Sequence, residues 1–274
     1  MNNKSNINLK RLFLKFKNEP FLYLTIFSIV ILIALFVAYP LLRVMSYPEL
    51  NSFQEYFTRS RWVNATFNSL MMALLSTIST TLCGFLFAYG MVRTKIPGKR
   101  FFETVAILPI LSPPFVVAIS YIMLFGGRGL ITYKLLGLNV DIYGWKGLWL
   151  VQTVTLFPYA YLLIRNVLTS ISPNLEYAAA NLGSTKWKTF WKVIFPLARP
   201  GVAGAALLVA ISVLADFGNP ILIAGNYALL PTEAYMQITG WYNLPSAAVL
   251  ATVLIIPTLI LFFLQRYWVN KRVY

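Results

Sequence analysis

The chain has 274 residues, of which 58% are hydrophobic and 11% are charged, and its mean hydropathy is +0.69. A soluble domain is about half apolar and about a quarter charged, so this composition excludes an ordinary soluble fold. The net charge of +15 is spread between long apolar runs instead of forming one basic patch, which argues against a nucleic-acid-binding protein. A single Cys and the absence of His exclude a disulfide framework and a zinc site.

Residues 1–20 form a basic segment ahead of the first apolar run. Their apolar side chains recur at helical spacing among Lys and Arg: Leu9, Leu12, Phe13 and Phe16. This pattern predicts an amphipathic helix on the membrane surface, with a disordered basic tail as the alternative. The apolar run that follows is longer than the roughly 7–15 residues of a secretory signal core, so we expect it to be retained as a membrane helix.

Six runs with few or no charges follow one another along the chain, and each is long enough to cross a bilayer as a helix. They are residues 21–42, 64–92, 104–125, 147–164, 200–225 and 246–265. The runs lack the alternation of a membrane β-strand, and a helix satisfies its own backbone hydrogen bonds in lipid. We therefore predict an all-α membrane protein with six transmembrane helices. Small residues along the second run predict that it is an interior helix.

The positions of the basic residues predict the orientation of these spans. With six crossings, 17 of the 23 Lys and Arg fall on the side of the two termini and six fall on the other side. Cytoplasmic loops carry the excess of basic residues, so we expect both termini in the cytoplasm. The expected partner of this charge is the lipid bilayer, not nucleic acid.

Residues 172–200, between the fourth and fifth runs, are too polar to span a membrane and too long for a minimal turn. Ser172 followed by Pro173 favours a helix start, and Gly183 suits the end of that helix. Beyond it, four apolar residues recur at helical spacing between lysines: Trp187, Phe190, Trp191 and Ile194. They predict a second helix at the membrane interface. From these residues alone, an amphipathic connection without a partner is the alternative.

This polar segment resembles the EAA loop of ABC importer permeases, in which Glu-Ala-Ala is followed by a glycine and, nine residues later, by Ile-x-Leu-Pro. Four residues match that motif: Ala178, Ala179, Gly183 and Pro196. Tyr177 stands at the glutamate position, and Glu176 lies one residue earlier. The resemblance implies that these six residues couple the chain to a cytoplasmic dimer of ATP-binding subunits. Closure of that dimer around ATP and Mg would then rock the membrane helices.

The resemblance covers nearly the whole chain, and its closing segments look most like ferric iron importer permeases. Those segments read ADFGNPILIAG and ITGWYNLPSAAVLATVLIIPTLILFFLQRYW. The resemblance implies a type I ABC importer fold in the bacterial cytoplasmic membrane, with residues 21–274 forming the six-helix permease domain. A binding protein outside the cytoplasm would deliver ferric iron, with phosphonate, thiamine and polyamine as alternative cargoes. Because two such units are often fused in the iron group, a second permease chain, identical or homologous, is also implied.

Catalysis is not expected of this chain. It has no Gly-x-x-x-x-Gly-Lys-Ser/Thr phosphate loop, so ATP hydrolysis is expected in a partner subunit, and we expect no bound cofactor or metal here. An ion-coupled secondary transporter is the rival from another class, but it would normally carry more intramembrane acids or repeated broken helices. A membrane enzyme is disfavoured because paired catalytic residues are lacking.

Asp216 is the one ionisable residue deep inside a predicted span, where a carboxylate costs roughly 2.5–3.5 kcal/mol on insertion scales. Gly218, Asn219 and Pro220 follow it, which predicts an interrupted helix that lines a gate or translocation path. The alternative is that Asp216 caps the second half of the helix. Prolines in other spans predict further breaks or, alternatively, packing kinks: Pro109, Pro113, Pro114, Pro158 and Pro257.

A tight ferric site needs several oxygen or nitrogen ligands, which this chain cannot assemble inside the membrane. We therefore expect the cargo to be captured by the binding protein. Four acids on the predicted outer loops are candidate contacts for it, with solvated surface charge as the alternative: Glu49, Glu55, Asp141 and Glu233.

Overall fold

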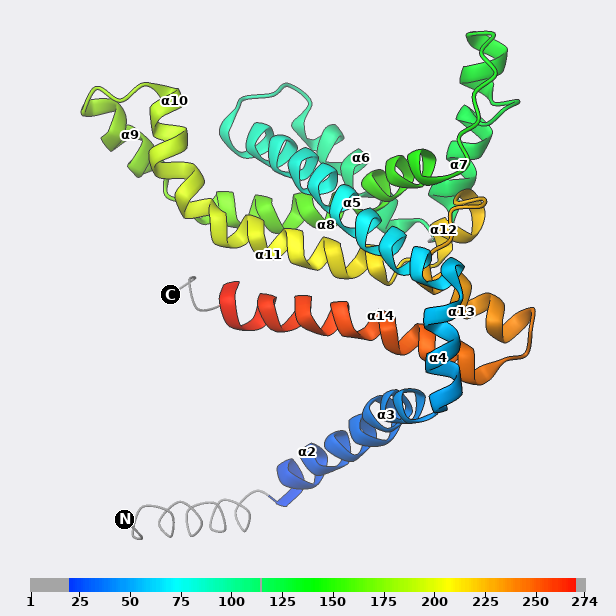
Figure 1. Ribbon diagram of the computed structural model, residues 1–274. Helices are drawn as coiled ribbons and strands as arrows, with labels where there is room; N and C mark the ends of the chain where they lie inside the picture. The colour runs from blue at the N-terminus through cyan, green and yellow to red at the C-terminus, as the bar shows by residue number, and fades with distance from the viewer. Residues whose placement is uncertain (1–19, 114, 270–274) are drawn as a thin grey trace. The chain divides into compact units, whose positions relative to one another are not determined.

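The structure is a computed structural model that describes residues 20–113 and 115–269 (Figure 1). The surface helix predicted around Leu9 to Phe16 lies outside the described residues. Pro114 also lies outside them. Within the described ranges every regular element is a helix, and six helices are long and apolar enough to cross a membrane. The predicted all-α fold with six spans is therefore confirmed.

The chain divides into two compact units, and the first ends at Glu49. Its described part consists of α2 (Pro20–Ile33), the π-helical η1 (Ala34–Ala38) and α3 (Tyr39–Ser46). These helices form one candidate span, Phe21–Ser46, in which no residue of the apolar window is buried by the protein. A helix of this length that is apolar all round is suited to cross a bilayer.

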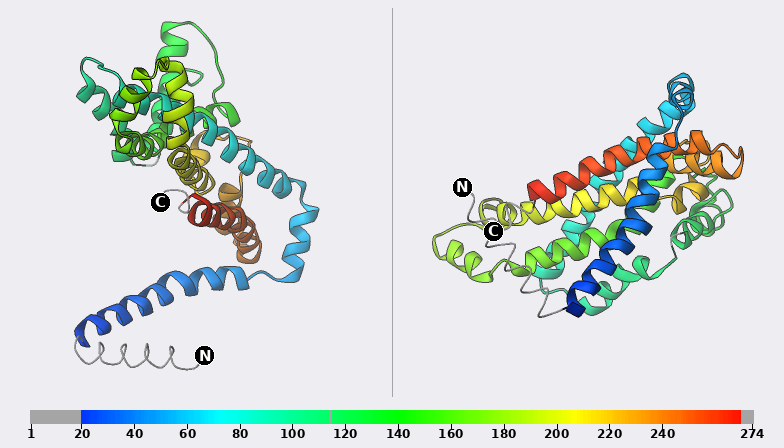
Figure 2. Two further views of the ribbon diagram at one scale, coloured as in Figure 1. Left: turned by 90° about the vertical axis from the view of Figure 1, so that its left-hand side faces the viewer. Right: turned by 90° about the horizontal axis from the view of Figure 1, so that it is seen from below.

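The second unit begins at Leu50 and contains all the other helices (Figures 1 and 2). Its α-helices are α4 (Leu50–Thr58), α5 (Ser60–Arg93), α6 (Lys99–Leu111), α7 (Val116–Phe125), α8 (Trp145–Ser170), α9 (Pro173–Asn181), α10 (Lys186–Thr189), α11 (Phe195–Leu214), α12 (Gly218–Ile223), α13 (Leu230–Thr239) and α14 (Leu244–Leu264). Its π-helical segments are η2 (Leu130–Leu135), η3 (Phe190–Ile194) and η4 (Gln265–Val269).

Helices α5, α8 and α11 form the centre of this unit, and α14 runs alongside α11 (Figures 1 and 2). The crossing of α5 and α8 is close because Gly84 lacks a side chain. A Cβ atom added to Gly84 would lie 2.8 Å from Cβ of Ala160. The small residues of α5 are buried along the same face: Ser69, Ala73, Ser76 and Thr80. The prediction that the second span is an interior helix is thus confirmed.

The prediction of one helix over residues 104–125 is wrong, and the break that was one expectation for the prolines of this run is present. Helix α6 ends at Leu111, and Ser112 is extended with φ −85° and ψ 142°. A residue that precedes proline is pushed out of the helical region, and Pro113 follows directly. The apolar span in this part of the chain is instead 116–135, from α7 through η2.

The fifth span also differs from its prediction. It runs from Lys186 to Leu214 without interruption, so the predicted interface helix at Trp187 continues directly into the membrane span. Pro196 lies just after the junction of η3 and α11, inside this continuous helix. Helices α6, α8, α11 and α14 each continue through an internal proline, so a break does not follow from proline alone.

Candidate functional site

Helix α9 carries the coupling motif and is capped at both ends by residues of the sequence pattern. At its start, Ser172 Oγ accepts a hydrogen bond from the backbone N–H of Asn174, at 3.3 Å. At its end, the N–H groups of Gly183 and Ser184 donate to the carbonyls of Ala180 and Ala179. These two bonds form a Schellman motif, which requires the left-handed conformation that Gly183 adopts with φ +78°. The predicted start and end of this helix are confirmed.

The surface of α9 is open. None of its residues is buried; Tyr177 is 67% exposed, and Leu182, directly after the helix, is 88% exposed. Apart from Gly183 itself and its two neighbours in the chain, no atom of the described residues lies within 4 Å of the position that a Cβ of Gly183 would take. Five residues of the predicted coupling set therefore lie on or next to one exposed short helix: Glu176, Tyr177, Ala178, Ala179 and Gly183. Pro196, the sixth, lies farther along on α11.

Glu176 differs from the other motif residues because it is paired inside the chain. Its Oε1 lies 3.1 Å from Nε of Arg93, the last residue of α5, and its side chain is 28% exposed. Arg93 was counted in the sequence only among the residues that set the orientation. No local pattern indicates this pair, since its partners come from different helices.

Aromatic rings pack the helix that follows α9, formed by α10 and η3, against α5. Phe190 of η3 packs edge-to-face against Tyr89 and Phe85 of α5, with ring centroids 5.3 and 6.0 Å apart. On the same helix, Trp187 and Trp191 remain 72% and 47% exposed. The helical spacing of these residues therefore serves two purposes: one ring anchors the helix to the bundle, and the tryptophans face outwards, as expected at a membrane interface.

The interruption predicted around Asp216 is present, because α11 ends at Leu214 and α12 begins at Gly218. The Asp216 carboxylate accepts hydrogen bonds from the backbone N–H of Asn219 at 3.2 Å and from its side-chain amide at 3.0 Å. Asp216 thus caps α12, which is the alternative that the sequence left open.

Asp216 is also connected to the spans through Gln152. Nε2 of Gln152, on α8, donates to Asp216 Oδ2 at 3.0 Å, and Ser76 of α5 donates to Gln152 Oε1 at 2.9 Å. The chain of bonds therefore joins α5, α8 and the break before α12. Gln152 was missed in the sequence, although a single amide in the apolar run 147–164 was a signal for it.

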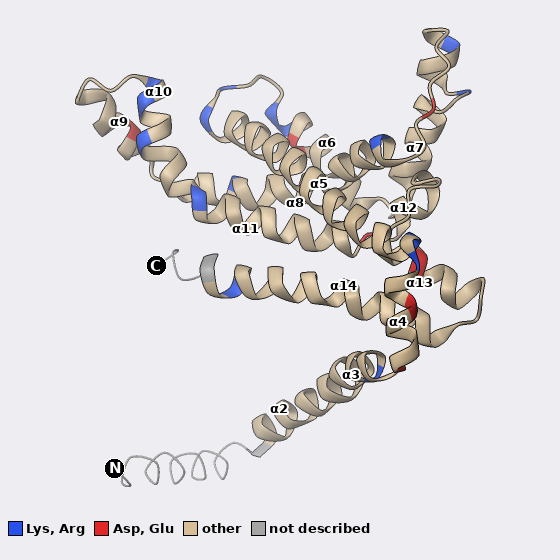
Figure 3. Ribbon diagram, in the orientation of Figure 1, with Lys and Arg blue, Asp and Glu red and all other residues tan. Residues whose placement is uncertain are grey.

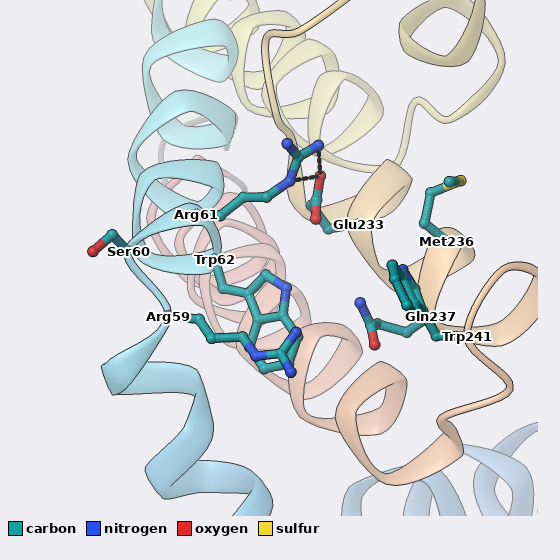
Figure 4. Close-up of a pocket in the computed structure, with 8 residues that line it drawn as sticks. All are labelled: Arg59, Ser60, Arg61, Trp62, Glu233, Met236, Gln237 and Trp241. Carbon is teal, nitrogen blue, oxygen red and sulfur yellow. Dashed lines mark hydrogen bonds and ion pairs between the residues drawn. The ribbon is translucent and has the colours of Figure 1, made fainter.

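A pocket of about 510 Å³ lies at the N-terminal end of α5, at the opposite end of that helix from Arg93 (Figure 4). In its wall, Nε and Nη2 of Arg61 both donate to one carboxylate oxygen of Glu233, Oε1, at 2.9 and 2.7 Å. The guanidinium of Arg59 lies 4.6 Å from the ring centroid of the buried Trp62. Met236, Gln237 and Trp241 of the α13 region complete the wall.

The interpretation of the predicted outer acids as solvated surface charge is wrong for Glu233, which is 5% exposed and held by Arg61. Glu55 forms an ion pair with Arg59 and accepts a hydrogen bond from Ser246 Oγ at 3.1 Å. Asp141 accepts from the N–H of Tyr143 at 2.9 Å. These three acids thus have partners within the chain.

Known proteins resemble this chain in sequence and in fold. Residues 80–274 match the family described as binding-protein-dependent transport system inner membrane component. The chain is 30% identical to the putative ferric transport system permease protein FbpB 1 of Haemophilus influenzae, over 94% of this chain and 43% of that protein. It is 30% identical to the sulfate transport system permease protein CysT of Escherichia coli, over 76% of this chain and 77% of that protein.

Among solved structures, a bacterial ABC transporter involved in the import of the acidic polysaccharide alginate has a similar fold, with a TM-score of 0.80. The match has 17% sequence identity and covers 96% of this chain and 100% of that chain. The chain spans less than half the length of the ferric permeases it matches, 43% for FbpB 1 and 39% for FbpB of Actinobacillus pleuropneumoniae.

Proposed function

Because this chain belongs to the binding-protein-dependent transport system inner membrane component family, we propose that it is the membrane-spanning permease subunit of an ATP-driven ABC importer. The observation that carries the proposal is α9, a short helix that is capped at both ends and packs no residue into the core. A helix so well ordered and so little buried presents a ready surface for a partner protein.

The partner of this surface is a dimer of cytoplasmic ATP-binding subunits, which bind ATP and Mg. Ala178, Ala180 and Gly183 are exposed and have little side-chain bulk, so a groove of the ATPase can approach the backbone of α9 beside the exposed ring of Tyr177. Closure of the ATPase dimer moves α9, and the membrane spans move with it. The binding energy of ATP thereby drives the opening and closing of the translocation path through the membrane.

Both termini and α9 lie on the cytoplasmic side of the bacterial inner membrane in this proposal. The support is the excess of basic residues on that side. Figure 3 displays part of it, with Lys and Arg on α10 and on the connection between α5 and α6.

Two further partners complete the importer. A second permease unit, identical or homologous, forms the other half of the path. The support is that the matched ferric permeases are more than twice as long as this chain. A binding protein outside the cytoplasm delivers the cargo. One solved relative of similar fold is an alginate transporter in complex with its periplasmic protein.

Ferric iron is the cargo we propose, because ferric permeases match 94% of the chain. An oxyanion is the second candidate, since sulfate and molybdenum permeases of Escherichia coli match 76% and 68% of it. Calorimetry of the binding protein with ferric iron, sulfate and molybdate separates the two. Tight binding of ferric iron alone is expected, and preference for an oxyanion would reject iron as the cargo.

The test of the permease itself is reconstitution. The chain, the proposed partner ATPase and the binding protein are purified and placed together in proteoliposomes loaded with ATP. We expect uptake of radiolabelled ferric iron that requires ATP and stops with vanadate. Uptake that persists without ATP and collapses with an ionophore would instead establish the ion-coupled transporter.

A further inference from the structure

We propose that Arg93 is a positioning residue that locks the coupling helix α9 to the C-terminal ends of α5 and α8, so that movement of α9 is passed to these two spans. The proposal deepens the importer function and rests on it. The ATPase-facing role that the motif resemblance suggested for Glu176 is replaced by a role inside the chain.

The lock consists of one guanidinium that reaches three segments. Arg93 ends α5, and its side chain is only 9% exposed. Its Nη2 donates to the carbonyl oxygens of Leu168 at 3.1 Å and Ile171 at 3.0 Å. Its Nε lies 3.1 Å from Oε1 of Glu176, as an ion pair without a hydrogen bond between these two atoms. Arg93 therefore holds the end of α8, the connection after it and the first turn of α9 at once.

An arginine suits this position for a chemical reason. The last carbonyls of a helix have no partner within the helix, and a cation near them is favourable. A planar guanidinium offers five donors in a fixed fork, whereas an ammonium is a single point charge. Only Ile171 and Ser172 separate α8 from α9. Two hydrogen bonds on the α8 side and an ion pair on the α9 side of so short a connection restrict its freedom to bend.

Helix α9 depends on this lock because apolar packing does not fix it. None of its residues is buried. In the part of the chain that the structure describes, the pair with Arg93 is the one side-chain ion pair or hydrogen bond that joins α9 to another helix. The Glu176 carboxylate also lies in the first turn of α9, where the helix dipole favours a negative charge.

The lock changes which residues are left for the ATPase. Glu176 is turned towards Arg93 and is 28% exposed, whereas Tyr177 and Leu182 are 67% and 88% exposed. The shifted position of the acid in the motif, one residue before the usual one, is explained by this internal pair. Contact with the ATPase then falls to Tyr177, Leu182 and the small residues between them.

The experiment removes either side of the lock in the full-length chain. The variants are Arg93→Gln, Glu176→Gln and both together, with Arg100→Gln as the matched control. Arg100 is exposed near the start of α6 and has no ion pair to any residue that the structure describes. Arg93→Lys is a second, milder variant that keeps the charge but loses the fork.

The first readout needs no ATPase. Spin labels replace Asn181, at the end of α9, and Leu163, on α8, in a Cys83→Ser background in lipid nanodiscs. We expect one narrow distance distribution for the parent and Arg100→Gln and a broad one for Arg93→Gln and Glu176→Gln. Arg93→Lys should fall between them. An unchanged distribution in Arg93→Gln would overturn the lock whether or not the chain is an importer.

The second readout is ferric iron taken up per ATP hydrolysed in proteoliposomes. We expect about a fivefold to tenfold fall in Arg93→Gln and Glu176→Gln, no further fall in the double variant, and normal copurification with the ATPase. A normal ratio in either single variant would overturn the transmission role. A wild-type chain that neither copurifies with an ATPase nor uses ATP would reject the importer function itself, together with the transmission role.

Discussion

Helix α5 carries an Arg–Glu ion pair at each of its ends, and the two pairs are built in opposite ways. At the C-terminal end Arg93 is 9% exposed and Glu176 is 28% exposed, whereas at the N-terminal end Arg61 is 66% exposed and the Glu233 side chain 7%. Glu233 belongs to α13, which also buries Leu230 and Gln237, but α9 buries nothing. The same chemistry thus reinforces a packed helix at one end and positions an unpacked helix at the other.

The largest effect is expected from blocking the exposed surface of α9, near the C-terminal end of α5. Gly183→Arg places a long cation on the open surface after α9, so we expect uptake to fall at least about a hundredfold while membrane insertion is retained. Immunoblotting of membranes and transport in proteoliposomes measure the two effects. Wild-type uptake together with wild-type copurification of the ATPase would contradict this use of the surface.

Gly183→Ala is the matched control for that substitution. It imposes the left-handed conformation on a residue with a Cβ, which costs about 1 kcal/mol, but adds almost no bulk. We expect most of the uptake to remain. If the alanine variant lost as much uptake as the arginine variant, backbone strain and not a blocked surface would explain both.

The next largest effect is expected from disrupting the packing between the middle of α5 and α8. Gly84→Leu forces a side chain into the space of Ala160, and overpacking of this kind costs about 1–3 kcal/mol or more. Thermal unfolding in detergent should show a clearly lower Tm. The control is Leu86→Ala on the exposed face of α5, which is 61% exposed and should leave Tm nearly unchanged.

A smaller effect is expected from Asp216→Ala. The substitution removes the cap of α12 and leaves the amide of Gln152 without its acceptor, for a loss of about 1–2 kcal/mol. Because the bonds join α5 and α8 to the break after α11, we also expect altered uptake rates with intact assembly. Unchanged uptake in proteoliposomes would remove Asp216 from the gate, and Asp216→Asn tests whether the cap alone suffices.

The smallest effect is expected at the N-terminal end of α5, where Arg61 pairs with Glu233 of the packed helix α13. Arg61→Gln leaves the nearly buried Glu233 without its guanidinium, but Arg61 is largely exposed, so the loss should be about 1 kcal/mol. Uptake per ATP hydrolysed should not change. A fall in uptake per ATP hydrolysed as large as that of Arg93→Gln would contradict the proposed difference between the ion pairs at the two ends of α5.

Local patterns in the sequence predicted the elements well. Long apolar runs predicted the spans, and Ser172 with Pro173 and Gly183 predicted both ends of α9 because caps depend on neighbouring residues only. The break before Pro113 was one of the two outcomes predicted for the prolines in the spans, since a residue before proline avoids the helix.

The pairs that hold the site were not predictable in this way. Arg61 and Glu233 are 172 positions apart, and Gln152 reaches Asp216 over 64 positions. Such contacts arise only when the helices pack, so Arg61 looked like a topology signal and Glu233 like a surface residue in the sequence, and Gln152 was not recognised as the partner of Asp216. The burial of Glu233 is the clearest example, because its partner lies on another helix.

Helix α9 is proposed to be the cytoplasmic binding site of the ATPase. Thiol labelling at position 182 tests this proposal most directly. The Leu182→Cys variant in a Cys83→Ser background is treated with a membrane-impermeant maleimide on intact cells and on inside-out vesicles, with and without the ATPase. We predict no labelling on intact cells, strong labelling of stripped inside-out vesicles, and protection when the ATPase is bound. Labelling on intact cells would contradict the account.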